Sequence, residues 1–268
     1  DVTPVDKVTV DGTLLSGRRS SKEKIDGAPI LHESLNLSGT SMSHILATIS
    51  PTMHLSKLHL SKCALHRVPD PVLDMQSLTD LNLNGNNIED ITGLCNCLSA
   101  LRIVDCSENP ITSFPVEVGN LCKLRELLSF KCRLQTLPSE LFNCTALVDL
   151  NLYSNGIVSV PGEITQLTHV RCLNLASNKL TQLPRGAFDD MQELRRLALF
   201  WNMLPSLPSL KSCALLEEVL ANGNKLQEFP ELGSHPHLRI INVNRNMIKS
   251  LPESCFGAHQ MPVLQTVD

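Results

Sequence analysis

Apolar residues recur along this chain with a period of 23 positions. In the segment from Leu147 to His169, apolar residues stand at positions 1, 4, 6, 11 and 14, with mostly polar residues between them. Position 4 is occupied in turn by Leu35, Leu58, Leu81, Val104, Leu127, Leu150 and Leu173, and at looser spacing by Leu197, Val219, Ile241 and Val267. The copies are numbered by these residues, with copy 1 at Leu35. A fixed period of this size is typical of a solenoid.

Each copy predicts one short strand followed by a turn. The alternation of apolar positions 4 and 6 gives a strand with one buried face, from which position 5 points outward. One such strand cannot bury its own apolar side, so the copies must stack in parallel to make a continuous core. A proline recurs at position 15 and is expected to end the descending turn, at Pro69, Pro115, Pro138, Pro161, Pro184, Pro208, Pro230 and Pro252.

Position 9 is the most regular polar position of the copies. It is occupied by Asn86, Asn109, Cys132, Asn155, Asn178, Asn202, Asn224 and Asn246, with Cys63 and Thr40 in the first two copies. An amide at this place can bond backbone groups of the turn in its own and the adjacent copy. We therefore predict a structural ladder of side chains that runs along the stack.

The segment "LVDLNLYSNGIVSVPGEITQLTH" and its neighbours "LTDLNLNGNNIEDI", "VRCLNLASNKLTQLP" and "LRIINVNRNMIKSLP" resemble the leucine-rich repeat family. The resemblance implies an α/β solenoid, a horseshoe with a parallel β-sheet on the concave face and short helices or 3-10 turns on the convex face. The "LPSEL" and "VPGEI" steps are similar to the 23-residue cytoplasmic repeats of Ras-pathway and cell-polarity scaffolds.

The chain divides into two parts. Residues 1–30 are expected to form an irregular N-terminal capping region, with a kinase site hypothesised at "RRSS". Residues 31–268 hold about ten copies, and the last is incomplete. Because an uncapped solenoid exposes its last core face, we expect the chain to be a segment of a longer polypeptide.

Composition narrows the classes of function. The chain is 42% apolar and 19% charged, with a formal net charge of −4, which gives no general attraction to nucleic acid or to an anionic membrane. No apolar run is long enough to span a bilayer. Most of the ten cysteines fall at core positions of the copies rather than in clusters, which indicates a reducing compartment and a cytoplasmic location.

The sequence offers no catalytic or cofactor-binding constellation. Cys95 and Cys97 lack zinc spacing, and the pair His235 and His237, with Cys255 and His259 downstream, is expected to lie in a solvated loop. Phosphate-loop, nucleophile-elbow and metalloprotease signatures do not occur. We therefore expect no enzyme activity, no cofactor and no metal.

Positions 2, 3, 5, 7 and 8 are expected to form the exposed face of the sheet. Phe130, Tyr153 and Phe200 stand at position 7, and Trp201 follows Phe200, so we predict an aromatic binding patch. The alternative is that these rings compensate for irregular packing, for example at Ser129. A stripe of arginines accompanies the patch, comprising Arg102, Arg125, Arg171, Arg195 and Arg239 at position 2 and Arg196 at position 3.

The predicted partner is a protein with acidic groups around an apolar anchor, held by guanidinium groups and rings. Internal ion pairs with Glu126, Asp149, Glu217 and Glu218 are expected to neutralise part of the stripe. The first hypothesis is a signalling scaffold or adaptor. Two alternatives remain open: the targeting or regulatory arm of a larger phosphatase, kinase, GTPase or cyclase, and a structural subunit of a large assembly. Neither nucleic-acid binding nor membrane insertion is expected.

Overall fold

The computed structural model describes residues 34–50, 52–250 and 266–267. The chain divides into two units after Ile30, and the described residues all belong to the second, Leu31–Asp268. The predicted capping region and the "RRSS" sequence lie outside the described residues, as do Pro252, Cys255 and His259.

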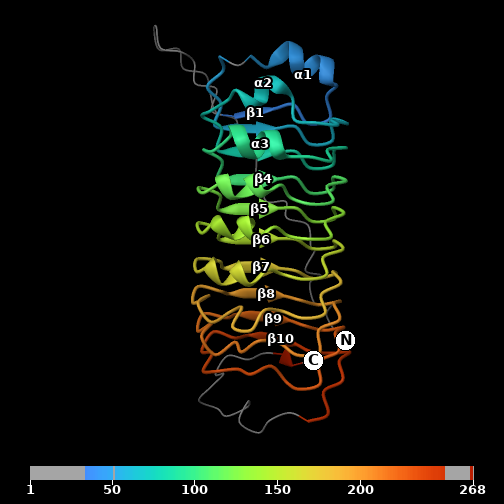
Figure 1. Ribbon diagram of the computed structural model, residues 1–268, viewed down its shortest axis with the longest axis vertical. Coiled ribbons are helices and arrows are strands. Elements are labelled where there is room, and N and C mark those ends of the chain that lie inside the picture. Colours follow the sequence, from blue (N-terminus) through green and yellow to red (C-terminus); the bar gives the residue numbers. More distant parts are fainter. Residues whose placement is uncertain (1–33, 51, 251–265, 268) are drawn as a thin grey trace, which may run out of the picture. The chain divides into compact units, whose positions relative to one another are not determined.

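The second unit is built on one parallel sheet of eleven strands that follow one another in chain order (Figure 1). The strands are β1 (Ser34–Asn36), β2 (Lys57–His59), β3 (Asp80–Asn82), β4 (Ile103–Asp105), β5 (Glu126–Leu128), β6 (Asp149–Asn151), β7 (Cys172–Asn174), β8 (Arg196–Ala198), β9 (Glu218–Leu220), β10 (Ile240–Asn242) and β11 (Thr266–Val267). Copies 1 to 10 each contribute positions 3 to 5, copy 11 contributes positions 3 and 4, and equal positions are paired, as at Leu127 and Leu150. The predicted α/β solenoid is therefore confirmed.

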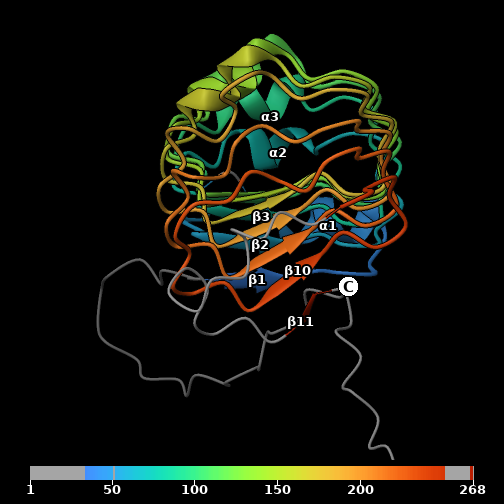
Figure 2. The same ribbon diagram turned by 90° about the horizontal axis from the view of Figure 1, so that it is seen from below.

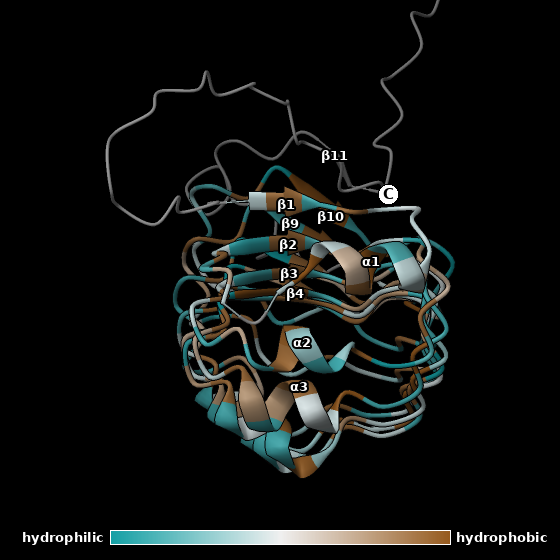
Figure 3. Cartoon of the chain, turned by 90° about the horizontal axis from the view of Figure 1, so that it is seen from above, coloured by the Kyte–Doolittle hydropathy of each residue, from teal (hydrophilic) through white to brown (hydrophobic). Residues whose placement is uncertain are grey.

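Short helical segments cover the side of the unit opposite the sheet (Figures 2 and 3). They are the α-helices α2 (Asp70–Leu73) and α3 (Thr92–Cys97) and the 3-10 helices η1 (Val116–Asn120), η2 (Ser139–Asn143) and η3 (Gly162–Gln166). The α-helix α1 (Met42–Thr48) lies instead at the β1 end of the stack (Figures 1 and 3). Pro69, Pro115, Pro138 and Pro161 are the N-cap residues of α2, η1, η2 and η3. These four position-15 prolines thus start a helical segment, whereas no helix or 3-10 helix follows Pro184, Pro208 or Pro230 within the described residues.

The core lies between the strands and this helical side. In copy 6, Leu147, Leu150, Leu152 and Ile157 are at most 1% exposed. The one polar interruption at position 6, Ser129, is also fully buried, and its Oγ lies 2.7 Å from Cys106 Sγ. The neighbouring copy therefore satisfies this hydroxyl.

In each of copies 1 to 10, the residue at position 8, in the turn after the strand, has a left-handed backbone conformation. Position 8 has a φ between +51° and +74° and is occupied by Gly39, Lys62, Gly85, Glu108, Lys131, Ser154, Ser177, Trp201, Gly223 and Arg245. Only glycine adopts this conformation at little cost, so the other copies hold position 8 by hydrogen bonds across the stack. The turn aims position 9 inward.

Asparagine side chains link these turns. Asn178 Nδ2 donates to the carbonyl oxygens of Leu152 and Leu175, each at 3.0 Å, and its Oδ1 accepts from the Ile157 N–H, also at 3.0 Å. The same pattern recurs at Asn86, Asn109, Asn155, Asn202, Asn224 and Asn246. At Cys132 the thiol donates to Cys106 O but supplies no oxygen acceptor. Each amide thereby connects its own copy with the preceding one.

Candidate functional site

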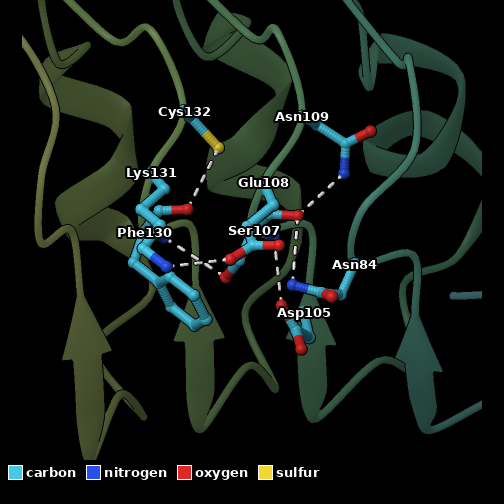
Figure 4. A network of polar contacts seen from close by, with 8 residues as sticks. All are labelled: Asn84, Asp105, Ser107, Glu108, Asn109, Phe130, Lys131 and Cys132. Carbon is cyan, nitrogen blue, oxygen red and sulfur yellow. Dashed lines mark hydrogen bonds and ion pairs between the residues drawn. The ribbon is translucent and has the colours of Figure 1, made fainter. Parts of the chain in front are cut away.

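Phe130 is held on the strand face by a polar network between copies 4 and 5 (Figure 4). Its N–H donates to Ser107 Oγ at 3.2 Å, and its carbonyl accepts from the Glu108 N–H at 2.9 Å. The Lys131 ammonium pairs with the Glu108 carboxylate at 3.1 Å. These bonds fix the backbone, while the half-buried Phe130 ring forms no aromatic pair within the described residues.

Tyr153 and Phe200 form an aromatic pair although one complete copy lies between them. Their ring centroids are 6.0 Å apart and their planes are inclined by 47°. Ala176 stands between them at position 7 and is fully buried, while both rings remain half-buried. Because alanine leaves room between the two rings, they meet across copy 7 and present a joint apolar surface.

Two residues at position 7 are buried, although this position was expected to be exposed. The sequence prediction that position 7 faces solvent is wrong at Ala176 and at Ser107, which are both fully buried. Ala176 lies between two larger neighbours, and Ser107 Oγ accepts the Phe130 N–H. The exposed surface of this row is therefore concentrated at the rings.

Trp201, the fourth aromatic residue of the predicted patch, makes no ring contact with the Tyr153–Phe200 pair among the described residues. Its left-handed φ of +53° places it in the turn, and 49% of the residue is exposed. The Arg245 guanidinium carbon lies 5.4 Å from the ring centroid, but Trp201 forms no aromatic pair with the adjacent Phe200 in the described structure. The adjacency of Phe200 and Trp201 in the sequence did not indicate that their rings are apart. The sequence feature that could have indicated it is that Trp201 stands at position 8, as Gly223 and Arg245 do.

The arginine stripe divides into paired and unpaired members. Arg171 binds Glu193 with Nε and Nη2 at 2.9 and 2.7 Å, and Arg195 binds Glu217 at 2.7 Å. Arg196 is 3.9 Å from Glu218. In contrast, the exposed Arg102, Arg125 and Arg239 form no ion pair with a described residue. Their guanidinium groups are free to hold an anionic group of a partner.

The centre of the strand face carries carboxylates whose charge is disfavoured. Burial and, to a smaller extent, the Glu126 carboxylate on the paired strand raise the pKa of Asp149 to about 6, although Arg196 lowers it in part. Burial likewise raises the pKa of Asp105. A shallow cavity of about 200 Å³ lies over β6 to β9 and is lined by Asp149, Cys172, Arg196 and Glu218, among others. This arrangement suits recognition of charged and apolar groups.

One expectation about the histidines is wrong. His235, predicted to be solvated, is fully buried, and its Nε2 accepts the Gly233 N–H at 3.2 Å. Burial lowers the pKa of this imidazole, because the charged form would lose its hydration. Among the described residues, no group of three or more His, Cys, Asp or Glu side chains is placed to hold a metal ion. Within the same residues, no helix has the length and apolar character required to cross a bilayer.

Comparison with known proteins gives a partial sequence match and a broad structural match. The leucine rich repeat model matches residues 145–204. A putative disease resistance protein of Arabidopsis thaliana is 32% identical over 214 residues, which cover 78% of this chain and 16% of that protein. The chain spans only a small part of the curated relatives that it matches.

Two solved structures share the arrangement of strands over most of the chain. A Leptospira interrogans LRR protein has a TM-score of 0.65 at 26% identity, covering 88% of this chain and 65% of its own. The LRR ectodomain of the receptor kinase GASSHO1/SCHENGEN3 from Arabidopsis thaliana has a TM-score of 0.69 at 26% identity, covering 77% and 26%. Since the repeat period, the turn geometry and these matches agree, this chain belongs to the leucine-rich repeat family.

Proposed function

We propose that the chain is a protein-interaction module of the scaffold or adaptor class and that its strand face binds the partner. The observation that carries this proposal is the contact between Tyr153 and Phe200, which leaves an apolar surface half exposed on the sheet. Paired aromatic rings of this kind are common anchors of protein interfaces. The GASSHO1/SCHENGEN3 ectodomain was solved in complex with CASPARIAN STRIP INTEGRITY FACTOR 2, which supports a binding role for this fold.

The partner that fits this face has an apolar side chain and nearby acidic groups. Its apolar side chain would contact Tyr153 and Phe200 in copies 6 to 8, and its carboxylates would contact Arg102 and Arg125 in copies 4 and 5. Equal positions of adjacent copies are about 4.8 Å apart, so these contacts would be roughly 10–15 Å apart along the stack. Arg171 and Arg195 would contribute less, because each already binds a glutamate.

We also propose that the chain is cytoplasmic and that its repeats belong to the 23-residue cytoplasmic subtype. All nine described cysteines are free, and most of them are buried at positions where a small apolar residue belongs. Free thiols at core positions are typical of proteins from reducing compartments. Comparing the redox state of the cysteines in protein isolated under alkylating conditions would test this location.

A second candidate is that this unit serves as the targeting or regulatory arm of a larger signalling protein. The observation that favours it is the small share of the curated relatives that the chain spans, 16% for the Arabidopsis disease resistance protein. In that case the same face would bind the partner. The length of the native polypeptide, measured by immunoblotting of whole cells, distinguishes the two candidates.

The test is quantitative affinity capture from native lysate with the unmodified chain and the Tyr153→Ala/Phe200→Ala variant. A matched control carries Val116→Ala and Val158→Ala, which remove two apolar side chains that are 57% and 46% exposed away from the strands. We expect the partner to be lost with the strand-face variant and retained by the control, with similar thermal midpoints. Equal recovery by the two variants would contradict the proposal.

A further inference from the structure

The turns of copies 7 to 10 carry a second exposed surface, called here the turn surface. Its apolar members are Trp201, Met203 and Met247, which are 49%, 36% and 61% exposed. Its cationic members are the exposed side chains of Lys179, Lys225, Arg245 and Lys249. All of them stand at positions 8, 10 and 12 of their copies, outside the strands.

Backbone hydrogen bonds hold these turns in register. The Trp201 N–H donates to Asn222 O at 2.9 Å, and the Met247 N–H donates to Leu226 O, also at 2.9 Å. Equivalent bonds join the intervening turns, so that positions 8 and 10 form two neighbouring rows along the stack. The apolar and cationic side chains therefore lie on one continuous strip with a spacing of about 4.8 Å between copies.

The Trp201 ring is placed against the next copy. A Cβ atom added to Gly223 would lie 2.8 Å from Cε3 of the ring, and two other ring atoms would lie within 3.2 Å. The ring therefore occupies the space above the glycine, while Arg245 flanks it with its guanidinium carbon 5.4 Å from the ring centroid. A bulky residue in left-handed conformation is costly, and this one places half of its surface in solvent rather than in the core.

Cations predominate on this strip. Positions 7 to 12 of copies 7, 9 and 10 include Lys179, Lys225, Arg245 and Lys249, and those of copy 8 carry no charge. The nearest carboxylate in sequence, Glu228, stands at position 13 of copy 9. The corresponding turn of copy 4 differs, because Glu108 stands at position 8 there and pairs with Lys131 of copy 5. The chain as a whole has a formal net charge of −4, so this local excess of cations is a departure from its surroundings. Such a field attracts and orients acidic groups.

We propose that the turn surface binds an acidic protein segment that carries an apolar side chain. The apolar side chain would pack on Trp201, Met203 and Met247, and the carboxylates would lie against the surrounding cations. A protein segment fits better than an anionic bilayer, because the Trp201 ring lies against Gly223 and only half of the residue is exposed. This surface is separate from the proposed strand-face site.

The test selects a random peptide library, displayed on phage, against the unmodified chain. We expect the retained peptides to be rich in Asp and Glu around a Leu, Met or aromatic residue. Trp201 is the only tryptophan of the chain, so binding of the synthesised peptides should change its fluorescence emission directly. Affinity should fall as salt is raised, because the cations are exposed.

Two charge-reversal variants decide the result. Lys179→Glu/Lys225→Glu alters position 10 within the turn surface, while Lys62→Glu/Arg133→Glu alters positions 8 and 10 of copies 2 and 5. The first variant should weaken peptide binding by about tenfold or more, which corresponds to one order of magnitude in Kd. The second should leave binding unchanged.

The proposal is overturned if the retained peptides lack acidic residues, if they bind without changing the tryptophan emission, or if the two variants bind them equally. Phosphatidylserine vesicles that shift the emission of Trp201 when the peptides do not would also overturn it in favour of a membrane surface. Loss of strand-face binding in the Tyr153→Ala/Phe200→Ala variant is independent of all these outcomes, so the two proposals can fail separately.

Discussion

Replacing Asn178 by leucine should destabilise the fold, because the N–H of Ile157 would lose its hydrogen-bond acceptor. The side chain is 8% exposed and accepts the N–H of Ile157, whose side chain is fully buried. The carbonyls of Leu152 and Leu175 would each retain an amide donor, since Asn155 donates to the first and Asn202 to the second. The Ile157 N–H, however, would lose its partner altogether.

The expected loss is therefore the cost of one buried, unsatisfied donor, about 1–3 kcal/mol. For a chain of this size, 2 kcal/mol would lower the thermal midpoint by roughly 4–8 °C. Urea denaturation gives the free energy of unfolding, and hydrogen exchange at the Ile157 N–H reports the loss of its hydrogen bond. The control is Asn222→Leu, because its half-buried side chain forms no hydrogen bond with the described residues. If Asn178→Leu cost no more than the control, the ladder reasoning would be refuted.

Three further outcomes are expected. Cys132→Asn should raise the free energy of unfolding, measured in urea, by about 1 kcal/mol. The new amide oxygen would supply the acceptor that the Ile111 N–H lacks among the described residues. Asp149→Asn should stabilise the chain by about 1–2 kcal/mol at pH 8 and hardly at all near pH 3, as thermal unfolding at the two pH values would show. Cys122 should be alkylated before Cys95, whose pKa burial raises to about 12, as peptide mass spectrometry would show.

The sign of the Asp149 effect follows from the direction of its pKa shift. Its pKa is about 6 in the folded chain and close to 3.8 when unfolded, so the ionised carboxylate destabilises the fold above pH 6. This penalty disappears as the pH falls toward the unfolded value. An equal gain from Asp149→Asn at both pH values would contradict the assignment, and the exposed Asp74→Asn is the matched control. For the thiols, equally fast alkylation of Cys95 and Cys122 would be inconsistent with the burial.

The fold could be predicted from the sequence because one period determines both pairing and packing. Leu127 and Leu150 are 23 positions apart and stand opposite each other in adjacent strands. With the same spacing in most copies, every apolar position 4 enters the same core. The proline at position 15 similarly placed the start of a helical segment at Pro115, Pro138 and Pro161.

The candidate site could be predicted only in part, because a register gives the row of a residue and not the reach of its side chain. The contact between Tyr153 and Phe200 depends on the small Ala176 between them. The burial of His235 depends on packing that no spacing reveals. Likewise, Trp201 is next to Phe200 in sequence, yet the left-handed φ of position 8 assigns it to the turn.

Site-specific photocrosslinking tests the central claim, that the strand face binds a protein partner, most directly. A photoreactive phenylalanine analogue would replace either Phe200 on the strand face or Val158, which is 46% exposed away from the strands. Irradiation in native lysate should yield a discrete partner adduct from position 200 and none from position 158. An adduct formed from position 158 alone would contradict the claim and assign recognition to another face.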